Sequence, residues 1–217
     1  MDEFILTLAQ STGQKVDFKK QLRHLYNPSA NEVMVVDIPA IKFLMVDGMG
    51  NPNTAQAYQE AVEALYATAY ALKFLFKKEQ EFDYVVMPLE GLWWVPDMRE
   101  FSIEHKEVWQ WTMMIAQPQE VTEALFEQVR AQVQRKKPSP ALAKLRLEQF
   151  REGVAAQIMH HGPFATEGPT IARLHAFLQE QGYTPGGKHH EIYLSDPRRA
   201  APEKMRTVIR QPMVPIV

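Results

Sequence analysis

The sequence contains no cysteine among its 217 residues. This absence excludes disulfide bonds, thiolate metal ligands and a thiol nucleophile. No apolar run approaches the ~20 residues that a membrane-spanning helix needs. The net charge of −2 lacks the basic excess that drives non-specific nucleic-acid binding. We therefore expect a protein that does not span a membrane and does not contact nucleic acid directly.

The amino terminus, Met1-Asp2-Glu3-Phe4, has neither the basic start nor the apolar stretch of a signal peptide, which favours a cytoplasmic location. Aromatic and methionine side chains are abundant, with four Trp, seven Tyr, eleven Phe and eleven Met. Such side chains form adaptable apolar pockets, although they also fill ordinary cores. A small organic ligand is the partner that this composition favours.

Helix and strand patterns alternate along the first half of the chain. Apolar periodicity and turn residues predict two strands broken at Ile38-Pro39-Ala40, one long helix and then two further strands. The predicted elements are the strands Val33–Asp37 and Ile41–Val46, the helix Ala55–Lys78, and the strands Tyr84–Glu90 and Glu107–Ile115.

The same order of elements recurs in the second half. Two helices, over 119–135 and Ala141–Phe150, connect the halves. The second half is predicted to contain the strand Val154–His160, the helix Thr170–Gln181, and the strands Lys188–Pro197 and Lys204–Pro212. Strand, helix, strand, strand thus occurs twice, which indicates two fused halves of one domain.

We therefore predict an α+β fold with pseudo-two-fold symmetry, an antiparallel sheet with helices on one side, and a ligand cleft between the halves. An N-terminal extension covers residues 1–30. A single domain covers 31–217, with a first repeat (31–116), a helical connector (117–152) and a second repeat (153–217).

The strand Lys188–Pro197 carries the most informative pattern. Its alternation places Ile192 and Leu194 on a core face, and places His189, Glu191, Tyr193 and Ser195 on the opposite face. A carboxylate, a phenol and an imidazole in one row are typical of a pocket lining.

Glu191 is the central residue of this row. It can attract a ligand cation or act as a general base on water. The alternative is a structural ion pair with Lys188 or Arg210, because such pairs are common in folded proteins. Alternation alone leaves both interpretations open.

Further candidates lie in the first half. Glu90 lies in the equivalent strand, either as a second acid of the cleft or as a brace for the Gly91 turn. Aromatic side chains are candidates for ligand-stacking walls or for core packing, and alternation allows only one of the adjacent pair at 93 and 94 to face the cleft. These aromatic candidates are Trp93, Trp94, Trp109, Trp111, Tyr66 and Tyr70.

Metal and cofactor signals are weak. The pairs His160-His161 and His189-His190 are adjacent in strands, so their side chains point to opposite faces and cannot chelate one ion together. The Gly48-x-Gly50 loop lacks the third glycine of a dinucleotide site. No Gly-x-Ser-x-Gly motif indicates a serine hydrolase. We expect no metal and no cofactor.

Three runs, at 87–94 (Met-Pro-Leu-Glu-Gly-Leu-Trp-Trp), 109–115 (Trp-Gln-Trp-Thr-Met-Met-Ile) and 189–197 (His-His-Glu-Ile-Tyr-Leu-Ser-Asp-Pro), resemble the GyrI-like small-molecule-binding family. The resemblance covers roughly residues 31 to 215. It implies a duplicated α+β fold with a groove between the halves. It also implies that Glu191 is the ligand-facing acid.

The resemblance implies three functions. Related domains are the effector-binding parts of multidrug regulators, and stand-alone members bind bulky aromatic drugs; the lack of a DNA-binding domain in this sequence favours the stand-alone class. We expect binding of bulky aromatic molecules, neutral or cationic, with His189 either touching the ligand or helping to position Glu191. The alternative is a hydrolase that opens strained, cyclopropane-bearing alkylating compounds, with Glu191 activating water and Tyr193 or Glu90 assisting. A regulatory protein-binding module is a further alternative, and the sequence fits either a monomer or a homodimer.

Overall fold

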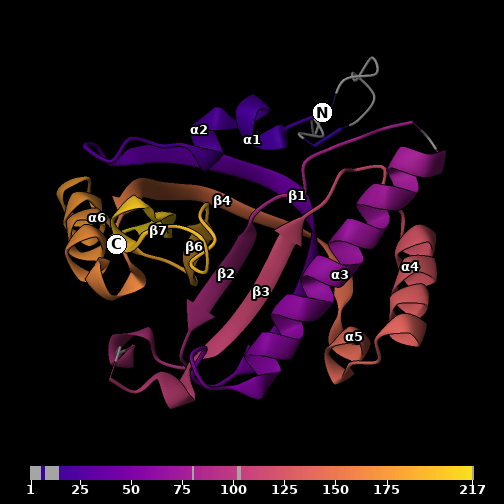
Figure 1. Cartoon of the computed structure of the whole chain (residues 1–217). Coiled ribbons are helices and arrows are strands. Elements are labelled where there is room, and N and C mark those ends of the chain that lie inside the picture. Colours follow the sequence, from indigo (N-terminus) through magenta and orange to yellow (C-terminus); the bar gives the residue numbers. More distant parts are fainter. Residues whose placement is uncertain (1–5, 8–14, 80, 102–103, 217) are drawn as a thin grey trace. The chain divides into compact units, whose positions relative to one another are not determined.

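Strands and helices alternate along the chain in a computed structural model that describes residues 6–7, 15–79, 81–101 and 104–216 (Figure 1). Within these residues the chain forms two compact units. Unit 1 comprises the residues up to Phe18 together with Ala40–Leu89 and Trp93–Phe150. Unit 2 comprises Lys19–Pro39, Glu90–Leu92 and the chain from Arg151 onward. The boundary between the units passes through the strands β1 (Met34–Met49), β2 (Leu89–Trp94) and β4 (Arg146–His161).

In unit 1 the second half of β1 pairs with β3 (Gln110–Ala116). The two strands are antiparallel, with Phe43 opposite Ala116 and Met49 opposite Gln110. The long helix α3 (Gln56–Glu79) buries an apolar stripe at three- and four-residue spacing and contacts β3. It also lies alongside α4 (Glu123–Lys136) and α5 (Pro140–Lys144), as Figure 1 shows.

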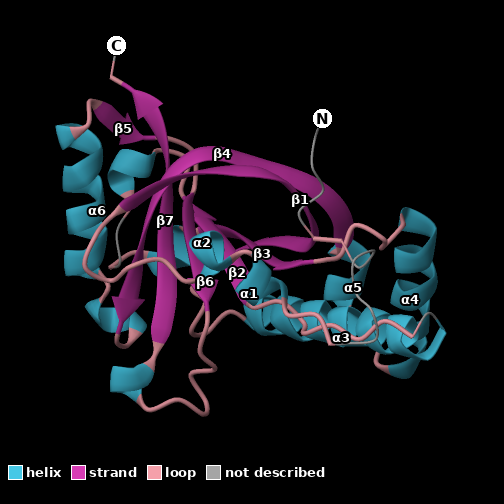
Figure 2. Ribbon diagram, turned by 90° about the horizontal axis from the view of Figure 1, so that it is seen from above, coloured by secondary structure: helices cyan, strands magenta, loops and turns pink. Residues whose placement is uncertain are grey.

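In unit 2 the strand β7 (Arg206–Pro215) is the common partner of three other strands. It pairs in antiparallel fashion with β4, with β5 (Tyr183–Pro185) and with β6 (His189–Tyr193). The helix α6 (Gly168–Glu180) lies alongside β5 and β7 (Figure 2). Its Leu174 and Leu178 join a buried apolar cluster with the strand residues Ala156, Ile158, Ile209 and Met213.

Short helices complete the chain. Two α-helical turns, α1 (Phe18–Gln21) and α2 (Arg23–Tyr26), precede β1. The 3-10 turns are η1 (Met98–Glu100), η2 (Lys106–Val108), η3 (Phe164–Thr166) and η4 (Pro202–Lys204). No helix in the described part of the chain is both long and apolar enough to cross a membrane.

The predicted α+β class is confirmed, and the ladders β1–β3, β4–β7, β5–β7 and β6–β7 are antiparallel. The order strand, helix, strand, strand occurs in the first half as β1, α3, β2, β3, whereas the second half, β4, α6, β5, β6, β7, contains the additional short strand β5. The division into an extension, two repeats and a connector stays a prediction. Residues 1–5 and 8–14 of the predicted extension lie outside the described residues.

The predicted break at Ile38-Pro39-Ala40 is wrong, because β1 continues through it from Met34 to Met49. A proline lacks the N–H group that a central strand needs. The ladder with β3 uses only Phe43 to Met49, so Pro39 lies outside it and the missing donor does not interrupt that pairing.

The predicted strand over Tyr84–Glu90 is also wrong in its first part, because β2 begins only at Leu89. Tyr84 forms an isolated parallel bridge with Val16 and is buried against Phe18 and Phe76. The apolar residues that start at Tyr84 therefore belong to an extended, partly buried segment that forms no strand ladder.

The predicted helix Ala141–Phe150 ends at Lys144, and β4 starts at Arg146. The side chains of Arg146 and Glu148 meet on one side of β4, with 2.6 Å between Nε and Oε2, as a strand period of two requires. Phe150 packs edge-on against Phe43 of β1. These tertiary contacts override a local sequence that also suits a helix.

Candidate ligand-binding site

The polar face of β6 brings three of the predicted residues together. The hydroxyl of Tyr193 donates a hydrogen bond of 2.8 Å to Oε2 of Glu191. Nε2 of His189 lies 3.3 Å from Oε1 of the same carboxylate. Ile192, between them in sequence, is fully buried in the core. The predicted alternation of β6 is therefore confirmed for these residues.

The strand ends earlier than predicted. β6 stops at Tyr193, so Ser195 does not continue its polar face. The Ser195 hydroxyl instead accepts a hydrogen bond of 3.1 Å from the backbone N–H of Arg206, at the start of β7.

Glu191 retains capacity for a further partner. Its side chain is 15% exposed, and an ionised carboxylate offers about four acceptor positions. Among the described residues, His189 is the one basic side chain within ion-pair distance of Glu191. The alternative pairing with Arg210 is wrong, because Arg210 binds Glu152. Glu191 is thus a largely buried acid with neither lysine nor arginine in ion-pair contact.

Two residues outside the predicted set lie near this acid. The ring of Phe164 packs edge-on against Tyr193, with 5.4 Å between centroids. His160 is buried and bonded to the hydroxyl of Thr170 at 2.9 Å. Burial lowers the pKa of His160, and the charge of Glu191 partly opposes that shift. An aromatic residue inside the Gly/Pro loop before α6 was the sequence signal that could have indicated Phe164.

The second predicted acid, Glu90, lies in a buried charge network of unit 2. Its Oε1 accepts a hydrogen bond of 2.9 Å from the Tyr26 hydroxyl, and its Oε2 lies 3.0 Å from Nε2 of His190. The side chains of Glu90 and His190 are each 1% exposed. Gly91 lies inside β2, so Glu90 braces no turn there, and its buried carboxylate is bonded to protein groups of unit 2.

Glu152 and Arg210 extend this network. Nδ1 of His190 lies 2.9 Å from Oε1 of Glu152, and Nη1 of Arg210 donates to Oε2 of Glu152 at 3.0 Å. The other guanidinium nitrogens donate to Oε1 of Gln157 and to the backbone carbonyl of Leu25. This network was not predicted from the sequence, although polar residues at core-facing strand positions were a usable signal.

The network shifts the pKa of its members. Burial would raise the pKa of Glu152, but the charges of His190 and Arg210 lower it to about 2. Burial would lower the pKa of His190, but the charge of Glu152 and hydrogen bonds to both acids raise it to about 9. Burial and the charge of Glu90 raise the pKa of Tyr26 well above its ordinary value.

Unit 1 contains a separate aromatic cluster. Trp93 stacks on Tyr58 at 6.0 Å between centroids and meets Trp109 edge-on at 5.6 Å. Phe101 stacks on Trp109 at 4.6 Å between centroids. Trp93 is buried and the adjacent Trp94 is half-buried, consistent with opposite faces of β2. The role of these rings in ligand contact stays a prediction.

Trp111 lies deeper in unit 1. Its six-membered ring covers Gly48, where any β-carbon would overlap the ring carbons. Tyr58 meets it edge-on at 5.4 Å. The indole Nε1 is buried and has no hydrogen-bond partner among the described residues. This packing is that of a core residue, and contact of Trp111 with a ligand stays a prediction.

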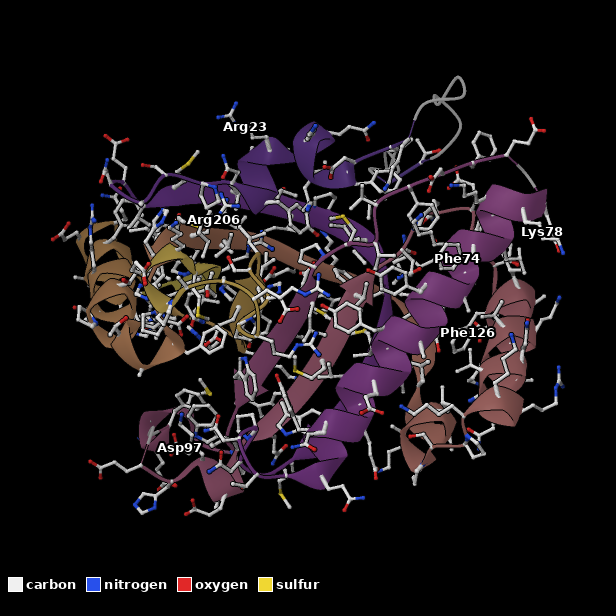
Figure 3. All side chains as sticks on the ribbon, viewed as in Figure 1. Arg23, Phe74, Lys78, Asp97, Phe126 and Arg206 are labelled. Carbon is white, nitrogen blue, oxygen red and sulfur yellow. The ribbon has the colours of Figure 1, made fainter. Side chains whose placement is uncertain are left out.

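The predicted pair Tyr66 and Tyr70 belongs to a longer aromatic row on α3. The rings of Tyr66 and Tyr70 are 6.3 Å apart, and Tyr70 stacks on Phe74 at 6.3 Å. The side chain of Tyr70 is 47% exposed. Phe74, labelled in Figure 3, is 59% exposed. Phe74 is the member that the sequence analysis missed, although it continues the four-residue spacing.

Throughout the described ranges, no group of three or more His, Cys, Asp or Glu side chains is arranged to hold a metal ion.

Comparison with known proteins identifies the family. A model of the GyrI-like small molecule binding domain matches residues 31–213. The chain belongs to this family. Two solved structures from Listeria innocua support the GyrI-like assignment. An uncharacterized conserved protein is 41% identical over 92% of this chain and 100% of its own, with a TM-score of 0.86. A hydrolase is 39% identical over 92% of this chain and 100% of its own, with a TM-score of 0.81.

A more distant similarity concerns the fold alone. The C-terminal domain of EcmrR is 9% identical over 85% of this GyrI-like chain and 98% of its own, with a TM-score of 0.52. No curated protein sequence matches the chain.

Proposed function

We propose that this GyrI-like protein binds bulky, flat aromatic molecules, cations among them, and that Glu191 supplies the negative charge of the site. One observation carries the proposal. The Glu191 carboxylate is largely buried, accepts a hydrogen bond from Tyr193, lies 3.3 Å from Nε2 of His189, and has no lysine or arginine in ion-pair contact within the described residues.

The contrast with Glu152 explains why this acid is the better candidate. Glu152 is enclosed by His190 and Arg210, so its charge is compensated inside the protein. The neighbours of the Glu191 carboxylate are the Tyr193 phenol and the His189 imidazole. A ligand cation that approached the remaining acceptor positions of Glu191 would therefore meet a poorly solvated negative charge. At about 4 Å, such a pair interacts by about 4 kcal/mol when the effective dielectric constant is about 20.

Aromatic side chains supply the apolar part of the proposed recognition. Tyr193 and Phe164 lie next to the acid and offer ring faces or edges to a flat ligand. The proposed lining also includes His189, the tryptophans Trp93, Trp94 and Trp111, and the tyrosines Tyr66 and Tyr70. A ligand cation over such rings gains cation–π attraction beside the charge of Glu191.

Fluorescence titration with ethidium, a flat aromatic cation, tests the proposal. Glu191→Gln should weaken binding about tenfold, which corresponds to about 1.4 kcal/mol. Glu203→Gln is the matched control, because Glu203 is an exposed glutamate of the same unit. A neutral dye of similar shape should bind the wild type and Glu191→Gln equally. Equal ethidium affinity of the wild type and Glu191→Gln would remove Glu191 from the site.

A hydrolase is the second candidate function. The Listeria innocua relative at 39% identity is named a hydrolase, and the Tyr193–Glu191 pair offers an acid beside a base. Glu191 would take a proton from water, whose oxygen would bond to a carbon of a strained cyclopropane ring. The ring C–C bond would break, and its electron pair would pass to a conjugated carbonyl, which Tyr193 would protonate.

Incubation with a cyclopropane-bearing alkylating compound separates turnover from binding. Mass spectrometry should find a ring-opened product that is heavier by one water, formed by the wild type and much more slowly by Glu191→Gln. If the wild type binds such compounds and forms no product, the hydrolase candidate fails and the binding function stands.

A further inference from the structure

Four side chains of alternating charge form a buried row inside unit 2, and one of them, His190, is the sequence neighbour of Glu191. Glu90, His190, Glu152 and Arg210 follow one another with contacts of 3.0, 2.9 and 3.0 Å. Their side chains are between 1% and 3% exposed. His190 immediately precedes Glu191 on β6, and alternation directs the two side chains to opposite faces.

The geometry around His190 places a carboxylate opposite each ring nitrogen. Nε2 faces a Glu90 oxygen and Nδ1 faces the Glu152 carboxylate. An ionised carboxylate only accepts hydrogen bonds, so both ring nitrogens must donate. The two negative and two positive charges of the network then sum to zero, and buried charges are tolerated when they are paired in this way.

We propose that His190, as an imidazolium, is the positioning residue for Glu191. Its two hydrogen bonds tie β6 to Glu90 of β2 and to Glu152 of β4, and these contacts fix the orientation of the Glu191 face. The inference rests on the proposed function and adds a proton requirement to it.

Loss of the proton would release β6. One ring nitrogen would then point its lone pair at a carboxylate, and the buried network would carry an uncompensated negative charge. The groups that face His190 directly are Glu90 from β2 and Glu152 from β4. Behind them stand Tyr26 of α2, which donates to Glu90, and Arg210 of β7, which donates to Glu152.

Alkaline pH is therefore expected to weaken ligand binding. The pKa of His190 is raised to about 9 by its acidic partners. If only the protonated state binds, the apparent affinity for ethidium should fall about tenfold for each pH unit above that value. A thermal melt at each pH separates this loss from global unfolding.

The variant Glu90→Gln sharpens this test. It removes one of the two carboxylates that stabilise the imidazolium, so the alkaline loss of affinity should begin at lower pH. Tyr26→Phe is the matched control, because it removes a hydrogen bond to Glu90 and leaves every charge in place. If ethidium affinity begins to fall at the same alkaline pH in Glu90→Gln as in the wild type, the proposal is overturned.

An NMR experiment on the free protein keeps this inference separate from the proposed function. Both ring nitrogens of His190 should carry protons at neutral pH, and the backbone amide signals of Glu191 and Tyr193 should shift with the His190 titration. A His190 ring with one protonated nitrogen, or amide signals that ignore its titration, would refute the positioning role. Failure of ethidium to bind the wild type at any pH would instead refute the proposed function and leave the NMR result valid.

Discussion

The phenol of Tyr193 and the carboxylate of Glu191 are joined by a hydrogen bond of 2.8 Å on the polar face of β6. Tyr193→Phe removes the donor and keeps the ring. In a binding protein, ethidium affinity should change only a few-fold, since a net hydrogen bond is worth about 1 kcal/mol. In a hydrolase, turnover should fall by about a hundredfold or more, because an acid–base partner is lost. Parallel calorimetric titration and product analysis distinguish the two cases, and a variant identical to the wild type in both would show that the pair has no functional role.

Stability should depend on pH in two separate windows. The folded pKa of His190, about 9, lies above its ordinary value of 6.5, so its contribution is complete below 6.5 and is lost as pH rises through 9. The folded pKa of Glu152, about 2, lies below its ordinary value of 4.5, so its contribution is complete above 4.5 and is lost as pH falls toward 2. The free energy of unfolding should therefore be highest between 4.5 and 6.5.

Urea denaturation across this pH range measures the effect. Each shift corresponds to a loss on the order of 3 kcal/mol outside its window. The alkaline loss should shrink in Glu90→Gln. A flat stability profile between neutral pH and about pH 10 would show that His190 is not held as an imidazolium.

Arg210→Met tests the compensation of buried charge. Removal of the guanidinium leaves Glu152 with His190 as its remaining cation in the network, and should cost about 3–5 kcal/mol of unfolding free energy. Arg206→Met is the matched control on the same strand, because Arg206 (labelled in Figure 3) is exposed. The control should change stability by less than about 0.5 kcal/mol. If Arg210→Met and Arg206→Met have the same unfolding free energy, Arg210 does not compensate the buried charge of Glu152.

Gly48→Ala tests the packing of Trp111. The new methyl group would overlap the indole ring, so the ring or the strand must move, at about 1–3 kcal/mol. Gly168→Ala is the control, since nothing lies within 4 Å of a β-carbon there. Differential scanning calorimetry should find a lower melting temperature for Gly48→Ala alone. A variant as stable as the wild type would mean that Trp111 is loosely packed.

Periodicity was sufficient to predict the elements that have a single strong pattern. The stripe of α3 and the alternation of β6 each depend on neighbours in sequence, so the helix and the polar face of Glu191 follow from local residues. The strand β1 and the start of β4 were predicted incorrectly, because Pro39 and the segment after Lys144 take their conformation from distant partners.

The buried network could not be predicted by the same means. Alternation assigns His190 to the core face, but it does not identify Glu90, which is 100 residues away in sequence. Pairing of that kind depends on the order and register of the strands. A histidine at a core position is a hint of buried charge, and its partners follow only from the fold.

A structure of the protein with ethidium bound tests directly whether Glu191 faces the ligand. We expect the charged ring system to lie within about 6 Å of Tyr193 or Phe164, with the Glu191 carboxylate in contact with the cation. If ethidium binds elsewhere and Glu191 contacts only Tyr193 and His189, Glu191 is not the ligand-facing acid.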